Sequence, residues 1–145
     1  MIVLRIAIIM FAVMELSNVL IMYFKPDFKY GNSMNAFKEW ADSKDDEARH
    51  LFAKYMVNWV ANCKAIFIAI LVVIAIVGTE TMMLYAVIAT VVSIFLYFVS
   101  LHPIICKLDK MGKINPKGYS KTLSYMIIGF ITMFVAALII YFIIR

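Results

Sequence analysis

Residues 57–77, with the sequence VNWVANCKAIFIAILVVIAIV, are apolar over a length that suits a membrane span. A helix needs about 20 residues to cross a hydrocarbon core of roughly 30 Å. Three further apolar runs occur, and the four predicted spans cover about residues 2–24, 55–77, 82–105 and 123–144. Because lipid offers the backbone no hydrogen-bond partners, each span is predicted to be an α-helix.

The composition of the whole chain agrees with these runs. It has 145 residues, of which 65% are hydrophobic and 16% are charged. A soluble domain is about half apolar and about a quarter charged. The sequence therefore predicts an all-α integral membrane protein: one four-transmembrane-helix bundle over residues 1–145, with a short interfacial amphipathic helix in the first loop.

Several classes of function are not expected. The net charge of +5 comes from residues that flank the spans, and no nucleic-acid-binding pattern accompanies them, so we expect no nucleic-acid partner. The two cysteines, Cys63 and Cys106, lie outside any CxxC spacing. No P-loop, nucleophile triad or metal-ligand pattern is found in the sequence, so we expect no metal and no cofactor.

The lysines and arginines predict an orientation. The first loop, residues 25–55, and the third loop, residues 106–122, carry most of the positive charge, whereas the short connection around Gly78 carries none. The positive-inside rule then places the first and third loops in the cytoplasm and both termini outside. We expect the membrane to be the cell membrane.

The first loop is predicted to be ordered. Residues 30–32 indicate a turn, and residues 33–41, SMNAFKEWA, carry three apolar side chains about three residues apart. This spacing predicts a short amphipathic helix. Its apolar side chains, Met34, Phe37 and Trp40, would either lie at the headgroup interface or cap the bundle from below.

The second span is predicted to continue a longer helix. Ser43 is a suitable N-cap, and three acidic residues follow it, where the helix dipole favours negative charge. The helix would therefore project from the membrane. Polar residues recur along it at spacings of three or four, namely Glu47, His50, Lys54, Asn58 and Asn62. Such a stripe is hard to explain as exposed to lipid.

Two ionisable residues lie deep in the first and second spans. Glu15 is nine residues from the loop end of its span, about 13 Å at the helical rise, and Lys64 is equally deep in the next span. Asn18 shares a helix face with Glu15. Opposite charges at one depth compensate each other's desolvation, which predicts a Glu15–Lys64 ion pair or a network through Asn62. Lys64 could instead extend toward the interface on its long stem.

The third and fourth spans add further polar groups near the loop side. Tyr97 and His102 lie toward the end of the third span, and Gly129 in the fourth is interpreted as a close-packing position. The candidates for a ligand or proton site are Glu15, Asn18, Asn58, Asn62, Lys64, Tyr97 and His102. These residues either form a satisfied polar network that specifies helix order or line a cavity that opens toward the cytoplasmic leaflet.

Two resemblances bear on function. Glu15, within AVMELSN, resembles the proton-coupling glutamate of small multidrug transporters, which implies proton-coupled transport. The chain departs from that family in its large first loop and in VVSIFLYFVS, which lacks a glycine-rich packing face. The four-span layout with an early arginine, Arg5, resembles DoxX-like small membrane proteins in topology.

We therefore expect a small polytopic membrane protein with a ligand-binding or accessory role and no catalytic activity of its own. The alternatives are a proton-coupled small-molecule transporter that uses Glu15, and an enzyme acting on a lipid or isoprenoid with Glu15, His102 or Tyr97 as acid and base. Expected partners are the lipid bilayer, a hydrophobic small molecule or lipid, and a second copy or another membrane protein.

Overall fold

The computed structural model describes residues 2–28 and 33–144, and every regular element in them is helical. The elements are α1 (Ile2–Phe24), η1 (Met34–Ala36), α2 (Lys38–Ser43), α3 (Glu47–Val77), α4 (Glu80–Ser100), α5 (His102–Lys110) and α6 (Tyr119–Ile144). Helices long and apolar enough to cross a membrane cover Ile2–Phe24, Glu47–Val77, Glu80–Lys110 and Tyr119–Ile144. The predicted all-helical architecture with four long apolar helices is confirmed.

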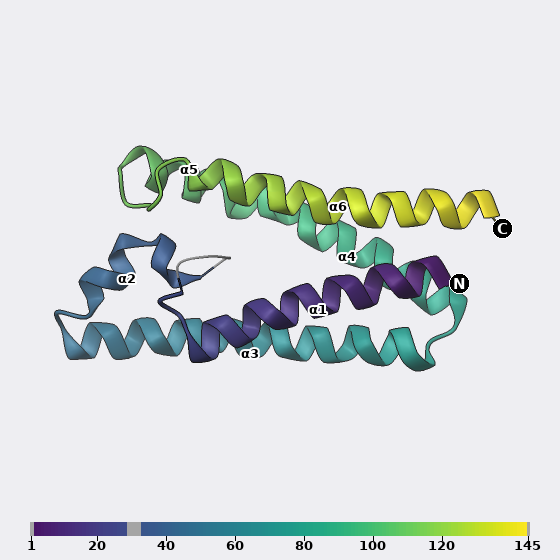
Figure 1. The fold of residues 1–145 in the computed structure, drawn as a ribbon, viewed down its shortest axis with the longest axis horizontal. Helices are drawn as coiled ribbons and strands as arrows, with labels where there is room; N and C mark the ends of the chain where they lie inside the picture. Colours follow the sequence, from purple (N-terminus) through teal and green to yellow (C-terminus); the bar gives the residue numbers. More distant parts are fainter. Residues whose placement is uncertain (1, 29–32, 145) are drawn as a thin grey trace.

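The long helices alternate in direction and give the molecule two distinct ends. Figure 1 shows α2 and α5 at one end, and the start of α1 with the end of α6 at the other. We call these the loop end and the terminal end. Helix α1 packs mainly on α3 and also on α6, which in turn packs on α4.

Hydrophobic packing is densest toward the terminal end. The fully buried side chains there include Leu4, Ile8, Met83, Val87 and Phe134. Between them and the loop end, the ring of Phe11 meets those of Phe130 and Phe134 edge-on, at centroid distances of 5.1 and 5.2 Å. Edge-to-face ring pairs at this separation are favourable. These ring contacts hold α1 against α6.

The start of α3 differs from the prediction. Asp46, not Ser43, is the N-cap, and its carboxylate accepts a hydrogen bond of 3.1 Å from the backbone N–H of Arg49. Ser43 ends α2 instead. Its hydroxyl donates to the carbonyl of Trp40 at 2.7 Å and lies 2.9 Å from His50 Nδ1. A serine engaged in these two contacts is not free to cap the next helix.

The segment predicted as one amphipathic helix, residues 33–41, is two short pieces, η1 and α2. Phe37 separates them in an extended conformation and forms an isolated antiparallel bridge with Ile114 of the third loop. Next to it, the backbone N–H of Lys38 donates to the carbonyl of Lys113 at 3.0 Å. These tertiary backbone bonds replace the helical bonds that would have continued across Phe37. The predicted turn at residues 30–32 lies outside the described residues.

The third loop is shorter than predicted because helix extends into it from both sides. After a break at Leu101, α5 continues to Lys110, with Pro103 in its first turn, where a missing N–H costs nothing. Helix α6 begins at Tyr119, four residues before the predicted start of the fourth span. The loop that remains between α5 and α6 is therefore compact.

Candidate functional site

The polar centre of the bundle joins α1 to α3. The Nζ atom of Lys64 lies 2.6 Å from Glu15 Oε2 and donates a hydrogen bond of 2.6 Å to Asn18 Oδ1. The side chains of Lys64 and Glu15 are 26% and 18% exposed. The predicted ion pair is therefore present, and the alternative in which Lys64 extends toward the interface is wrong. We refer to Glu15, Asn18 and Lys64 as the polar triad.

Two cavities flank the polar triad. The first, of about 180 Å³, lies between α1 and α6 and is lined by Met14, Glu15, Ser17, Asn18, Ile21, Leu123, Met126, Ile127 and Phe130. The second, of about 270 Å³, is lined by Asn18, Met22, Ser33, Met34, Phe37, Val60, Lys64, Tyr97, Leu101, Ile104, Ile105, Leu108 and Leu123. Asn18 and Leu123 border both. Both linings are largely apolar with a few polar groups, as in small-molecule sites.

Tyr97 lines the second cavity and carries a buried polar atom. Its side chain is 7% exposed, and its hydroxyl is buried without a hydrogen-bond partner among the described residues. A buried hydroxyl without a partner costs about 1–3 kcal/mol. Lys64 and Asn18 line the same cavity, so three predicted site residues meet there.

The remaining predicted residues of the second span lie elsewhere. Asn62 is exposed and accepts a hydrogen bond of 3.3 Å from the hydroxyl of Tyr23, and Asn58 is half-buried. Both line a separate hollow of about 370 Å³ with Tyr23, Tyr55 and Trp59. The predicted network through Asn62 is therefore wrong. On an ideal helix Lys64 lies about 120° from Asn58, and it is the Lys64 face that meets Glu15.

His102 belongs to a third region, at the start of α5. Its Nδ1 atom lies 3.4 Å from Cys106 Sγ and 3.3 Å from Ser124 Oγ. Its ring lies 5.8 Å from that of Tyr97, but it lines a different hollow, between α5 and α6. The structure thus divides the seven predicted residues among three places. Within the described ranges, no group of three or more His, Cys, Asp or Glu side chains could hold a metal ion.

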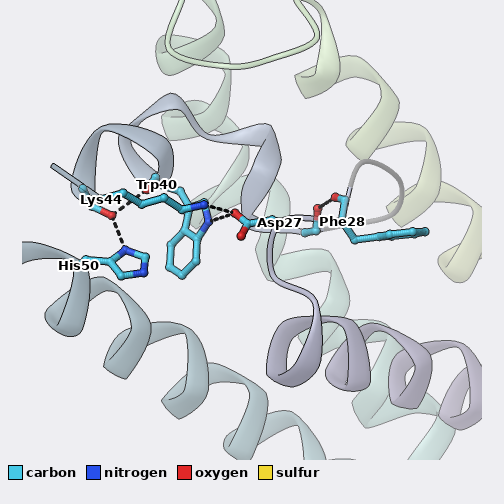
Figure 2. A network of polar contacts seen from close by, with 7 residues as sticks. Asp27, Phe28, Trp40, Lys44 and His50 are labelled. Atoms are coloured by element: carbon cyan, nitrogen blue, oxygen red, sulfur yellow. Dashed lines mark hydrogen bonds and ion pairs between the residues drawn. The ribbon is translucent and has the colours of Figure 1, made fainter. Parts of the chain in front are cut away.

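The loop end of the second cavity is fixed by a polar network, shown in Figure 2. Asp27 Oδ1 accepts hydrogen bonds from Trp40 Nε1 at 2.7 Å and from Lys44 Nζ at 2.8 Å. The hydrogen bonds from Lys44 and Trp40 hold the pKa of the Asp27 carboxyl below its usual range. Nearby, Ser43 contacts His50, whose ring lies 4.9 Å from that of Trp40. Trp40 is 3% exposed, so the first loop is anchored to the bundle.

Two residues that line the second cavity were predicted to have other roles. Met34 and Phe37 were predicted to face the headgroups or cap the bundle, and they form part of the wall of the second cavity. No local pattern distinguishes these possibilities, because the wall forms only when the first loop pairs with the third. Gly129, interpreted as a close-packing position, meets nothing within 4 Å of its Cβ direction, so that interpretation is wrong.

No family model matches this chain, and no match is found among curated proteins or solved structures.

Proposed function

We propose that this chain is an integral membrane protein that crosses the bilayer four times and binds a small amphiphilic molecule or lipid beside the polar triad. Four apolar helices support the membrane placement. Large hydrophobic side chains also cover their outer surfaces, as at Ile66, Ile70 and Val73, which are 59%, 54% and 57% exposed. Soluble monomers rarely expose continuous apolar surface of this kind.

The proposed orientation puts the loop end in the cytoplasm and the terminal end outside, in the cell membrane. The lysine-rich first and third loops lie together at the loop end, whereas the Gly78 turn between α3 and α4 carries no lysine or arginine. This is the distribution that the positive-inside rule describes. The anchored η1–α2 segment would then lie at the headgroup level.

The observation that carries ligand binding is the second cavity. It is lined by Tyr97, Lys64 and Asn18 in an otherwise apolar space, and Tyr97 carries a buried hydroxyl without a hydrogen-bond partner among the described residues. An amphiphile would place its polar head at these three groups and its hydrocarbon part along the apolar wall. Burial of hydrocarbon contributes about 25 cal/mol per Å², and the polar groups fix the orientation.

Photocrosslinking tests this proposal. The full chain, reconstituted in phosphatidylcholine nanodiscs, would be irradiated with a palmitate that carries a diazirine, and the labelled peptides mapped by mass spectrometry. We expect labels on cavity residues that are buried or half-buried, such as Met22 and Met34. Tyr97→Phe removes only the unpartnered hydroxyl, and we expect it to reduce this labelling. The matched control is Tyr125→Phe, because Tyr125 is 72% exposed and lines neither cavity.

A different result would contradict ligand binding. If Tyr97→Phe leaves the labelling unchanged and raises the melting temperature, the hydroxyl is only an uncompensated buried group. Labels spread evenly over the outer helix surfaces would show that the probe sits in the lipid.

A proton-coupled transporter is the second candidate, supported by the position of Glu15. This residue lines the first cavity and is paired with Lys64, which lines the second. Protonation of the carboxylate would therefore change the charge at both cavities. In weakly buffered detergent, the protein would then release or take up protons when it binds the palmitate probe. A pH-sensitive dye would follow this exchange. The Glu15→Gln variant would show no such exchange.

A further inference from the structure

A third hollow lies between α5 and α6 at the loop end, apart from both cavities of the polar triad. Its volume is about 460 Å³, and it is lined by His102, Cys106, Asp109, Lys110, Lys117, Gly118, Ser120 and Lys121. None of these residues lines either cavity at the polar triad. The hollow is therefore a separate feature that the proposed function does not use.

The three lysines of this hollow take part in none of the ion pairs that the described residues form. In the described part of the chain, ion pairs join Lys44 to Asp27, Lys64 to Glu15 and Lys113 to Glu39. None involves Lys110, Lys117 or Lys121, although the neighbouring Lys113 is paired. Three like charges around one hollow repel one another, and an anion between them relieves that repulsion.

The single carboxylate in the hollow is already engaged. Asp109 Oδ1 accepts from the backbone N–H of Gly118 at 2.9 Å, and Oδ2 accepts from the N–H and hydroxyl of Ser120 at 3.1 and 2.6 Å. Asp109 is buried, and it holds the start of α6 against α5. It therefore builds the wall of the hollow. Its charge attracts the nearby Lys117, but it forms no ion pair with any of the three amines.

We infer that this hollow binds a phosphate group, and specifically the phosphate of an anionic lipid headgroup. Ammonium groups form charge-assisted hydrogen bonds with phosphate oxygens, and basic pockets between span ends on the cytoplasmic side suit anionic headgroups. The hollow lies where α5 ends and α6 begins, at the depth at which headgroups would meet the proposed bundle. The choice of a lipid source rests on the proposed membrane insertion, whereas the preference for phosphate rests on the lysines alone.

Thermal unfolding of the full chain in dodecyl maltoside tests the inference. We expect dihexanoyl phosphatidic acid to raise the melting temperature by a few degrees, because a ligand that binds only the folded state stabilises it. Dihexanoyl phosphatidylcholine at the same concentration should have no effect. Sodium phosphate, compared with sodium chloride at equal ionic strength, distinguishes the two sources of phosphate. If it raises the melting temperature as much as phosphatidic acid does, free phosphate is sufficient. If it raises the melting temperature less, the lipid is the preferred ligand.

Charge variants show where the anion binds. Lys117→Gln with Lys121→Gln should abolish the rise, and Lys110→Gln alone should reduce it. The matched control is Lys38→Gln with Lys107→Gln, which removes the same charge from exposed lysines outside the hollow and should keep the full rise. The inference is overturned if phosphatidylcholine is as effective, if the control loses the rise equally, or if the Lys117 and Lys121 variant keeps it. Photocrosslinking at Tyr97 reports on a different cavity, so the two proposals can fail independently.

Discussion

Lys64 binds two residues of one helix turn at once, with its Nζ atom 2.6 Å from both Glu15 Oε2 and Asn18 Oδ1. Its position ties α3 to α1 near the middle of both helices. Because neither charge is fully exposed, each depends on the other to offset the cost of leaving water.

Removing one partner of this pair should lower the stability of the fold more than removing both charges. We expect Glu15→Gln to destabilise the fold by up to about 3–5 kcal/mol, because it leaves the Lys64 ammonium without its counterion. The double variant with Lys64→Met should recover much of that loss. Thermal unfolding in detergent measures both. The control is Glu39→Gln, which breaks an exposed ion pair with Lys113 and should change the melting temperature little.

The same series also distinguishes the roles of Glu15. If the residue is only structural, the double variant should restore stability and leave probe binding intact. If it binds ligand or protons, the Glu15→Gln variant should fold but lose ligand binding or proton exchange. Adding Lys64→Met should then restore neither. A Glu15→Gln variant no less stable than Glu39→Gln would contradict the energetic importance of the pair.

Single-cysteine labelling tests the orientation. In a chain with both native cysteines replaced by serine, a cysteine at Thr79 should react with an impermeant maleimide added to intact cells. Cysteines at Asn35 and Asn115 should react only after permeabilisation. All three positions are exposed and lie between the long helices, so access depends on the side of the membrane. Labelling of Thr79 from the cytoplasm alone would reverse the proposed topology.

The contact of Asp27 with Lys44 and Trp40 should give the first loop an acid-sensitive anchor. Hydrogen bonds from Lys44 and Trp40 lower the pKa of Asp27 from its ordinary value of 3.8, so its stabilising contribution is present above that value. The contribution is lost as the pH falls through the lowered pKa. We therefore expect Asp27→Asn to lower the melting temperature slightly at pH 7 and by progressively less as the pH falls below 3.8.

A more severe change at the same position provides a comparison. Asp27→Ala also removes the acceptor for the indole N–H of Trp40, which is nearly buried, and should cost more than Asp27→Asn at every pH. Equal losses for both variants, or an Asp27→Asn deficit that grows in acid, would contradict this account of the anchor.

Alanine substitutions at two glycines should have different effects on the melting temperature. At Gly78, which ends α3, a Cβ would lie 2.3 Å from the backbone oxygen of Ile74, so Gly78→Ala must shift the α3–α4 connection and should lower the melting temperature. At Gly129, inside α6, a Cβ meets nothing within 4 Å. Because alanine favours a helix over glycine by roughly 0.5–1 kcal/mol, Gly129→Ala should be neutral or stabilising. Equal effects of the two changes would contradict the steric argument.

The sequence alone determined the four long helices and the register of their polar residues. An apolar run of about 20 residues has few stable alternatives to a helix in lipid, and the helical repeat puts Glu15 and Asn18 on one face whatever surrounds them. Matching depth on adjacent antiparallel helices also indicated a Glu15–Lys64 pair, while a network through Asn62 and an extended Lys64 stayed open until the structure showed the contact. These properties depend on local periodicity and on length, which can be read from the chain directly.

Only the tertiary structure decided which faces meet and where the loops pack. Lys64 and Asn62 both contact α1, but Lys64 meets Glu15 and Asn18 inside the bundle, whereas Asn62 meets Tyr23 at the surface, although both residues are polar and lie only two positions apart. Phe37 interrupts a helical pattern because it bridges to Ile114, far along the chain. Such choices depend on the packing of whole helices and on backbone bonds between distant loops, and no local pattern in the sequence encodes them.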